Sequence, residues 1–475
     1  MRYIPTIGLE IHAELKTETK MFCHSKNDAN ETRPNVNVCP VCMAHPGTLP
    51  VINRAAVMHV LRVGAALGGK LADYTEFDRK NYFYPDLPKG YQISQFEFPL
   101  VSGGSLASVA ITRIHLEEDT ASSVHSEESG ETFIDFNRAG VPLMELVTEP
   151  VIRSAEDAGR FARELQLLLR YLNVSDADME KGLMRVEANI SISTDETLGT
   201  KVEVKNLNSF KAMERSVEYE ISRQTKLLEK GEKVAQETRG WDEGKQATFA
   251  QRTKEGSADY RYFPDPDLPS LLLSDIEDCS LQKIVGDLPE LPEARRVRYR
   301  ALGIREEDAV SFVRDTSLGV FFESVISEFK GNSEFAVLAA NYIANDLVKL
   351  LRDIQDRGTQ GNAITITPKH FQKLILMVQE KKISSRGAKD ILAALSEESR
   401  DPEGIARERG YVQSSDIDVE KIVQEVIESN TSVAEQFRSG KANAVEFLLG
   451  QAMKAMKGTG NPSELREKIK KQLGG

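Results

Sequence analysis

Carboxylates and an imidazole alternate along one short segment near the start of the chain. From Ile7 to Leu15 every second residue is apolar, and Glu10, His12 and Glu14 occupy positions between them. This alternation predicts a β-strand with one polar face. Side chains two residues apart on a strand converge, and carboxylates with an imidazole then suit a divalent metal ion. The same pattern also describes the wet face of an ordinary sheet, so it leaves both interpretations open.

Two later acidic stretches favour the metal-binding interpretation. Residues 115–119 read His-Leu-Glu-Glu-Asp, and Glu145 stands inside the apolar run 141–147. A carboxylate in such a run requires a partner, because burying an unpaired charge is costly. A magnesium ion that carries phosphate oxygens would supply one. If residues 115–118 form a regular strand, Glu117 shares a face with His115, whereas Glu118 points with Leu116.

Three of the four cysteines, Cys23, Cys39 and Cys42, lie within 20 residues of one another. In a reducing compartment this clustering indicates metal binding or no special role rather than disulfides. The spacing Cys-x15-Cys-x2-Cys suits zinc, which takes four ligands in structural sites. The three cysteines are one ligand short of that number, and two alternatives follow. Either His24 completes the site, which would then be a structural one in a loop, or the site is degenerate.

The strands and helices that position these residues can also be predicted from the sequence. Alternation at residues 108–116, 186–192 and 201–205 predicts further strands of an antiparallel sheet with one polar face. Helical spacing begins after Asn53, after Ser154 and near Phe210, and Ser154 with Asp157 forms a capping pattern. The sheet and helices together predict an α+β domain.

The chain changes character near residue 292. The segment 288–292 reads Leu-Pro-Glu-Leu-Pro, which breaks regular structure, and the pattern beyond it is almost wholly helical. A second, softer break lies at residues 400–404, after which a new amphipathic pattern begins. We therefore predict an α+β domain at 1–292, a helical domain at 293–400 and a small helical tail domain at 401–475.

The totals limit the classes of function. The chain has 475 residues and a formal net charge of −12. This acidic balance excludes a protein that coats nucleic acid, so any such contact is expected to be local. Residues 1–11 lack the features of a secretory signal, and no stretch reaches the ~18 apolar residues of a membrane span. We expect a soluble, cytoplasmic protein without membrane contact.

Several long strings of the sequence resemble the GatB family, the B-type subunits of the bacterial and organellar tRNA-dependent amidotransferases. Such strings are highly specific, and the resemblance covers nearly the whole chain. They are Ile7–His12, Phe77–Asp86, Tyr91–Gln95, His115–Asp119, Val202–Phe210 and Asp259–Pro264, followed in the tail by Phe447–Gln451 and Met453–Lys454.

The resemblance implies a fold and a two-step reaction. The fold is a cradle similar to the catalytic domain of glutamine synthetase, followed by a helical domain and a tail that holds tRNA. First, ATP phosphorylates the side-chain carboxylate of glutamate wrongly esterified to tRNA-Gln, or of aspartate on tRNA-Asn. Ammonia then displaces the phosphate. The implied partners are the misacylated tRNA, the amidase GatA, which supplies ammonia, and the small protein GatC, in a heterotrimer.

The resemblance also implies site residues. The family's Mg²⁺ and catalytic site matches Glu10, His12, Glu118 and Glu145, so we follow the family for Glu118 and expect a strand end or bulge there. Charge and place in the matched strings make three cations candidate contacts of ATP or the tRNA terminus: Arg79, Lys80 and Lys205. Lysines of the tail, ordinarily a solvated helix face, become candidate contacts of the tRNA body: Lys441, Lys454, Lys457, Lys468, Lys470 and Lys471.

Three rival interpretations fit less well. The archaeal-type relative GatE carries an inserted domain, for which this chain has no room. A free-standing ATP-dependent ligase for a small acid would need no tail module. A scaffold that only binds tRNA would not need to keep Glu10, Glu118 and Glu145. The sequence does not decide between Glu-tRNA-Gln, Asp-tRNA-Asn or both as substrate.

Overall fold

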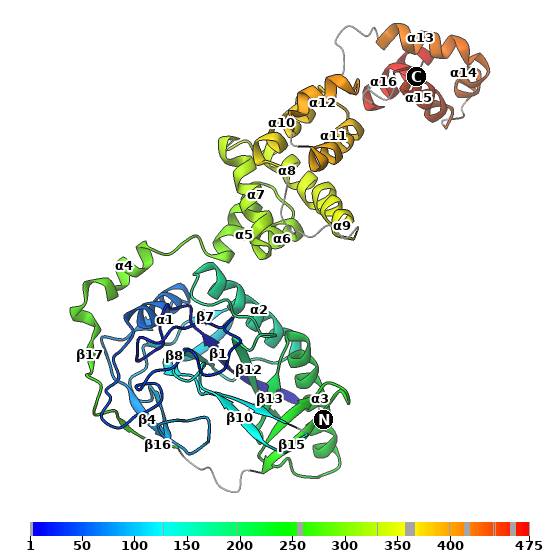
Figure 1. Ribbon diagram of the computed structural model, residues 1–475. Coiled ribbons are helices and arrows are strands. Elements are labelled where there is room, and N and C mark those ends of the chain that lie inside the picture. Colours follow the sequence, from blue (N-terminus) through cyan, green and yellow to red (C-terminus); the bar gives the residue numbers. More distant parts are fainter. Residues whose placement is uncertain are drawn as a thin grey trace. The chain divides into compact units, whose positions relative to one another are not determined.

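The computed structural model divides into two compact units, Met1–Pro292 and Glu293–Gly475, and each is described by itself (Figure 1). None of the described helices is long and apolar enough to cross a membrane. The structure describes residues 3–126, 128–195, 197–253, 260–329, 331–356, 366–398, 400–412, 419–439, 441, 443–456 and 462–474. Asp259 and Lys457, both singled out in the sequence, lie outside these residues.

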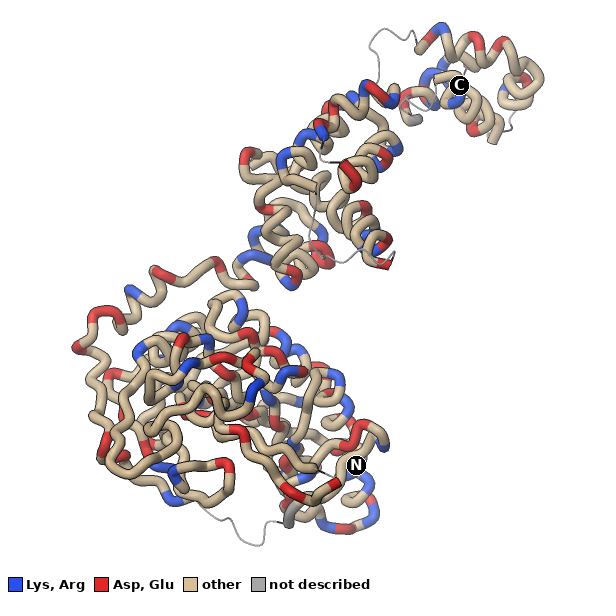
Figure 2. Tube along the Cα trace, viewed as in Figure 1, with Lys and Arg blue, Asp and Glu red and all other residues tan. Residues whose placement is uncertain are grey.

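Charged side chains of both signs are interspersed along both units (Figure 2). The net charge of −12 is therefore spread over the chain and not gathered in one acidic segment. Favourable contacts with a polyanion must accordingly be made at particular positions.

The first unit is built on a ten-stranded sheet with the order β15-β14-β13-β12-β1-β11-β8-β6-β2, and β7 pairs with β8. The strands are β1 (Ile4–Glu14), β2 (Lys70–Leu71), β6 (Val101–Ser102), β7 (Ser105–Leu106), β8 (Val109–Glu118), β11 (Pro142–Thr148), β12 (Met184–Ser193), β13 (Val202–Leu207), β14 (Glu237–Asp242) and β15 (Ala247–Thr253). The strand predicted at residues 7–15 is confirmed as β1.

One pair of neighbours corrects the prediction of an antiparallel sheet. Strands β13 and β14 run parallel, whereas the other described pairs of this sheet are antiparallel. The reason is the connection: helix α3 (Phe210–Glu229) lies between the two strands in the chain, and a crossover helix brings the chain back in the same direction. The domain is a mixed α+β structure.

Three smaller sheets accompany the large one. The most relevant has the order β16-β4-β5 and is formed by β4 (Asp78–Asn81), β5 (Tyr91–Ser94) and β16 (Arg261–Pro264). The others pair β9 (Ser122–His125) with β10 (Thr132–Asp135), and β3 (Tyr74–Thr75) with β17 (Leu271–Leu272).

Helices cover one face of the large sheet. These are α1 (Arg54–Ala66), α2 (Ala155–Tyr171) and α3. The predicted cap of α2 is confirmed, since the Asp157 N–H donates to Ser154 Oγ at 3.1 Å. Ser209 caps α3 in the same way, by accepting the N–H of Ala212 at 3.0 Å.

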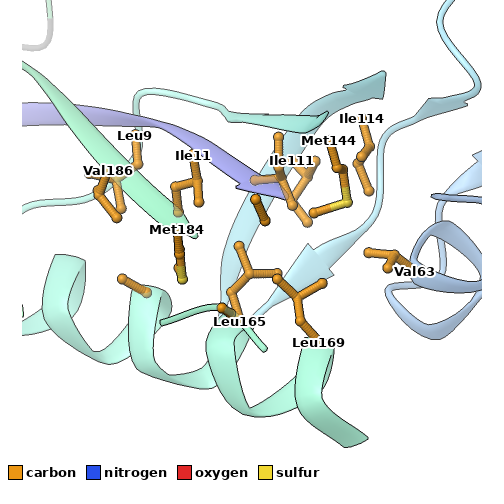
Figure 3. Close-up of a cluster of buried hydrophobic side chains, with 14 of the residues drawn as sticks. Leu9, Ile11, Val63, Ile111, Ile114, Met144, Leu165, Leu169, Met184 and Val186 are labelled. Carbon is orange, nitrogen blue, oxygen red and sulfur yellow. The ribbon is translucent and has the colours of Figure 1, made fainter. Parts of the chain in front are cut away.

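The core lies between this face and the helices (Figure 3). Leu9 and Ile11 of β1 and Met144 of β11 are buried there against Leu165 and Leu169 of α2. Burying each such side chain contributes about 1.5–3 kcal/mol relative to leaving it exposed. Because strand side chains alternate, this apolar face fixes which residues point the other way.

The second unit is helical, and its described residues form no strand longer than one isolated bridge, Ile383 to Val412. A core of its own joins the last four helices through Val423, Ala434, Leu448, Leu465 and Ile469. The helices from the end of the first unit onward are α4 (Leu281–Gly286), α5 (Pro292–Ala301), α6 (Glu306–Arg314), α7 (Thr316–Ile326), α8 (Ser333–Asn341), the π-helix η4 (Tyr342–Leu347), α9 (Val348–Asp356), α10 (Pro368–Gln379), α11 (Ser385–Glu397), α12 (Pro402–Glu408), α13 (Val419–Ser429), α14 (Thr431–Arg438), α15 (Ala444–Ala455) and α16 (Pro462–Leu473).

Candidate metal centre

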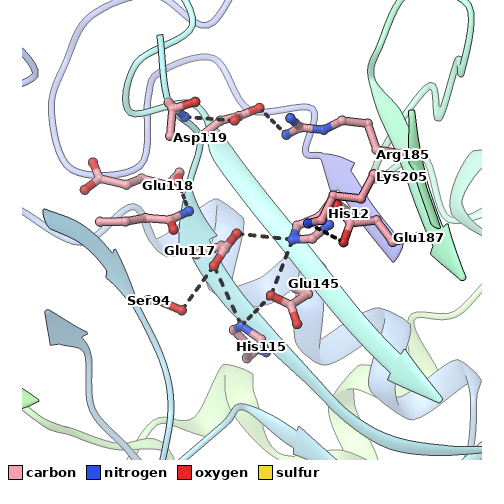
Figure 4. Close-up of polar contacts among 12 residues, drawn as sticks. His12, Ser94, His115, Glu117, Glu118, Asp119, Glu145, Arg185, Glu187 and Lys205 are labelled. Atoms are coloured by element: carbon pink, nitrogen blue, oxygen red, sulfur yellow. Dashed lines mark hydrogen bonds and ion pairs between the residues drawn. The ribbon is translucent and has the colours of Figure 1, made fainter. Parts of the chain in front are cut away.

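Strand pairing brings acidic and imidazole side chains together on the polar face of the large sheet. His12 of β1 is paired with Glu145 of β11, and Glu145 is paired in turn with His115 of β8. Glu117 stands two residues beyond His115 and therefore on the same face. Figure 4 shows these four side chains pointing toward one another. Residues far apart in the sequence thus form one cluster.

The cluster is tight and largely buried. His12 Nε2 lies 3.4 Å from Glu145 Oε2 and 3.5 Å from Glu117 Oε1. His115 Nε2 lies 3.3 Å from Glu145 Oε2. The potential ligand atoms of Glu10, His12 and Glu145 all fall within 4.8 Å of one another, as do those of His115, Glu117 and Glu145. Glu145 therefore belongs to both groups and lies at their centre.

Burial and mutual proximity shift the pKa values in this cluster. Burial, together with the charges of Glu145 and Glu187, raises the pKa of Glu10 to about 6. Burial by itself lowers the pKa of His12, but hydrogen bonds to Glu117 and Glu145 outweigh it and raise that pKa to about 10. The pKa of His115 rises to about 9, because Glu145 and Glu117 overcome the same desolvation. The imidazolium groups thereby offset the buried carboxylates.

The donor set fits a hard divalent ion. Three carboxylates and two imidazoles converge, and carboxylate oxygens are the ligands that Mg²⁺ and Mn²⁺ prefer. Nδ1 of His115 is also buried without a hydrogen-bond partner among the described residues. A bound cation would take over the charge compensation of the imidazolium protons, which would leave as it binds.

The structure corrects the expectation for Glu118. Strands β8 and β11 pair regularly at Glu118 and Glu117, and the irregularity of this pairing lies instead at Val147 and Thr148. Glu118 therefore points to the opposite side, where its carboxylate accepts from Lys89 Nζ at 2.7 Å and from the Ile93 N–H at 2.9 Å. No bulge turns it into the cluster. Glu117 faces the cluster instead, as strand alternation alone had indicated, and the pair of variants described below tests which glutamate is the ligand.

Of the three predicted cations, Lys80 and Lys205 lie beside the cluster. Burial lowers the pKa of Lys80, but the charges of Glu117 and then Glu145 raise it well above its usual value. Lys205 Nζ is 2.8 Å from Glu187 Oε2, and its charge acts to lower the pKa of Glu10. Both ammonium groups are thus held near the carboxylates of the cluster.

Arg79 has different surroundings. Its Nε donates to Asp265 at 2.9 Å, and its Nη2 lies 2.9 Å from Asp267. The guanidinium also stacks 4.4 Å above the ring of Tyr91. These contacts tie β4 to the segment after β16, so the structure gives Arg79 an anchoring role and does not bring it to the cluster.

Comparison with known proteins decides the family. Residues 5–277 match the GatB/GatE catalytic domain, and residues 320–473 match the GatB domain. The chain belongs to the GatB family. The second match and the relatives named below favour GatB over GatE.

Relatives of similar length extend over the whole chain. The B subunit of the aspartyl/glutamyl-tRNA(Asn/Gln) amidotransferase of Thermus thermophilus is 44% identical, with 99% of each chain covered. The protein of the same name from Thermomicrobium roseum is 43% identical over 100% of this chain and 99% of its own. The B subunit of the chloroplastic/mitochondrial glutamyl-tRNA(Gln) amidotransferase of Physcomitrium patens is 41% identical over 100% of this chain and 86% of its own.

The cysteine cluster of this GatB-family chain offers three thiols. The sulfur atoms of Cys23, Cys39 and Cys42 lie within 4.8 Å of one another. Cys42 Sγ also accepts the N–H of Cys39 at 3.1 Å and lies 3.8 Å from Nζ of the fully buried Lys20.

A fourth zinc ligand is missing from the described surroundings of this cluster. His24 is exposed and does not belong to the group, so the structure does not bring it to the three thiols. The nearest other candidate is the Ser25 hydroxyl, whose Oγ lies 3.7 Å from Cys42 Sγ. The residues therefore do not fit a closed four-ligand zinc site, and we derive no role through zinc.

A test of the face assignment compares Glu117→Gln with Glu118→Gln. We expect Glu117→Gln to weaken Mn²⁺ binding by about tenfold or more, because it removes a charged oxygen from the cluster. Glu118→Gln should leave the affinity close to that of the unmodified protein, because its carboxylate lies on the other side. Electron paramagnetic resonance of free Mn²⁺ measures both. Equal losses in the two variants would contradict the assignment.

A second test concerns the cysteines. Ser25→Cys places a fourth thiol beside Cys42, so this variant should purify with about one zinc per chain, measured by elemental analysis. Ser25→Ala is the matched control and should hold little zinc, as should the unmodified protein. Stoichiometric zinc in all three proteins would show that three thiols suffice here.

Proposed function

We propose that this chain is the component of a tRNA-dependent amidotransferase that activates the side-chain carboxylate of an amino acid misacylated onto tRNA. The acidic cluster on β1, β8 and β11 is its metal and phosphoryl-transfer site. The observation that carries the proposal is the convergence of three carboxylates and two imidazoles on one sheet face, in a chain whose relatives carry the amidotransferase name.

The proposed chemistry explains why such a site is needed. A carboxylate is a poor acyl donor, so its oxygen first attacks the γ-phosphorus of ATP, and ADP leaves. Ammonia then attacks the carbonyl carbon of the acyl phosphate, the bond from carbon to the phosphate oxygen breaks, and inorganic phosphate leaves. The products are Gln-tRNA-Gln from Glu-tRNA-Gln and, where this substrate is used, Asn-tRNA-Asn from Asp-tRNA-Asn.

The chain's own residues would bind the ion and the anionic reactants. Glu10, His12 and Glu145, with His115 and Glu117, would hold Mg²⁺. When bound, the ion offsets the charge of the phosphate oxygens during transfer. Lys80 and Lys205 stand beside these carboxylates as ammonium groups, and we propose that they contact the nucleotide or the tRNA terminus.

A scaffold without chemistry explains the site less well. Burying Glu117 and Glu145 side by side costs free energy, and a surface that only binds tRNA would gain nothing from it. An active site that must hold a cation provides a reason for this burial, because the cation neutralises both charges.

We further propose that the second unit comprises a helical domain at 293–400 and a tail domain at 401–475 that contacts the tRNA body. The core shared by α13–α16 supports a separate tail, and this core begins at Val419, whereas α12 packs on α10 and α11 of the preceding helices. Lysines on its described surface support the contact: Lys441, Lys454, Lys470 and Lys471 are exposed, and Lys468 is half-buried. Ammonia would come from the amidase GatA, held with the small GatC in a cytoplasmic heterotrimer.

ADP release by the chain assembled with GatA and GatC tests the phosphorylation step. We expect release that requires Mg²⁺ and Glu-tRNA-Gln and does not occur with correctly charged Gln-tRNA-Gln. Glu145→Gln should abolish it, because the amide removes the central charge without changing the side chain's volume. Full activity of this variant would exclude the cluster as the active site. Loss of both tRNA binding and assembly would indicate misfolding, so both are measured alongside.

Truncation tests the tail. A chain that ends at residue 400 should bind tRNA more weakly while it retains the metal site, because the cluster lies wholly in the first unit. Gel-shift titration with uncharged tRNA-Gln and Mn²⁺ titration measure the two properties separately. A truncated chain with undiminished tRNA affinity would assign the tail another role.

A further inference from the structure

Exposed aromatic side chains gather around the three-stranded sheet β16-β4-β5. The side chains of Tyr84, Phe96 and Tyr260 are 57%, 59% and 52% exposed. Each is large and apolar, and a group of such residues on a surface marks a binding site more often than an isolated one does. The residues come from segments that are far apart in the sequence, and the pairing of β4 with β16 brings them together.

The rings form two sets, and the rings within each set contact one another. Phe96 stacks on Tyr262, with ring centroids 4.3 Å apart and planes inclined by 16°. Tyr82 makes edge contacts with Tyr84 at 5.9 Å and with Tyr260 at 5.4 Å. The Lys80 ammonium lies 5.0 Å from the centroid of the Tyr260 ring. We call these five rings the aromatic platform: Tyr82, Tyr84, Phe96, Tyr260 and Tyr262.

The platform adjoins the metal centre. Lys80 is paired with Tyr262 on one side and with Gln92 on the other, so these side chains share a face of the small sheet. Ser94 lies on that face too, and its hydroxyl donates to Glu117 Oε2 at 3.2 Å. Burial raises the pKa of the Tyr262 phenol, the Lys80 ammonium lowers it, and the Glu117 carboxylate raises it, which places all three groups close together.

The proposed substrate must bring the terminal nucleotide of its tRNA close to the metal centre. Its reacting carboxylate is linked through one amino acid to the terminal ribose of the tRNA. When that carboxylate reaches the cluster, the last nucleotide therefore lies within the length of one amino-acid side chain. Unpaired nucleotides are recognised in proteins chiefly by stacking on aromatic rings, with cations placed among them.

We propose that the aromatic platform is the stacking site for the unpaired 3′-terminal adenosine of the aminoacyl-tRNA, with its base on the open face of the Phe96 ring. This inference rests on the proposed function and names the part of the substrate that the surface binds. The base extends the existing stack of Phe96 on Tyr262 by one layer. Tyr84 and Tyr260 offer further exposed ring area to the preceding nucleotides of the same strand.

Two other occupants fit the surface less well. The adenine of ATP has the same chemistry, but a small nucleotide is usually enclosed in a pocket, and here three rings are more than half exposed. A protein partner would find aromatic anchors here, yet the Lys80 charge beside the rings matches an anionic strand better.

The experiment uses the chain assembled with its partner proteins and a tRNA-Gln whose terminal adenosine is replaced by 2-aminopurine, a fluorescent analogue quenched by stacking. We expect quenching on binding by the unmodified complex. Phe96→Leu should reduce the quenching and weaken the affinity by about tenfold. Tyr260→Leu is a second variant, which removes another exposed ring of the platform. Phe133→Leu is the matched control, because Phe133 is 58% exposed and lies on β10 outside the platform.

Four outcomes overturn the proposal. The first is quenching that Phe96→Leu and Tyr260→Leu leave intact. The second is an equal loss with Phe133→Leu. The third is an increase in the KM for ATP with unchanged tRNA affinity, which would assign the rings to the cofactor. The fourth is loss of assembly with the partner proteins, which would make the surface a protein interface.

The assay contains Mg²⁺ but no ATP, so it is independent of the phosphorylation step. A failure of the proposed function would appear as ADP release by Glu145→Gln, whereas a failure of the stacking site would appear in the Phe96→Leu quenching.

Discussion

The buried carboxylate of Glu145 is the constraint on which the rest of the structure depends. It is only 5% exposed, on the strand between β1 and β8, and its charge is compensated by imidazoles from both neighbours. Breaking such a pairing from one side typically costs about 3–5 kcal/mol, so the three strands must keep one register. The apolar face enforces that register, because a shift by one residue would send Leu9 and Ile11 to the polar side. The core thereby specifies the cluster without touching it.

The end of β8 links the cluster to the small sheet by using two successive residues for two purposes. Glu117 points into the cluster and also accepts the Ser94 hydroxyl. Glu118 points away, where it binds Lys89 and the N–H of Ile93 on β5. The small sheet is therefore held from both sides of one strand. Glu117 and Glu118 are adjacent residues of the same type, yet they contact different groups and cannot replace one another.

Local patterns predicted the parts of the fold that depend on local chemistry. Alternation located β1, a capping serine located the start of α2, and a charge in an apolar run identified Glu145. Alternation also predicted the face that Glu117 shares with His115, whereas the expected bulge at Glu118 followed from matched strings, which carry residue types but no side-chain direction. The parallel pairing of β13 with β14 depends on the path of α3 between them, which no short window of the sequence contains. The aromatic platform was missed for the same reason: its rings come from two segments, far apart in the sequence, that the pairing of β4 with β16 brings together.

An acidic chain that handles a polyanion must gain its affinity from sources other than a broad basic surface. With a net charge of −12, neutralising phosphates over a large area would require cations that this chain does not have in excess. Stacking of unpaired bases avoids that requirement, because a ring attracts a base regardless of the charge around it. The basic side chains can then form ion pairs with carboxylates of the protein. Arg185 is paired with Asp119, and Lys205 with Glu187, on the sheet that bears the cluster. Excess negative charge next to the centre is thus cancelled within the protein. The terminal nucleotide can approach a site rich in carboxylates because the contact that holds it is aromatic and the charge beside those rings is the ammonium of Lys80.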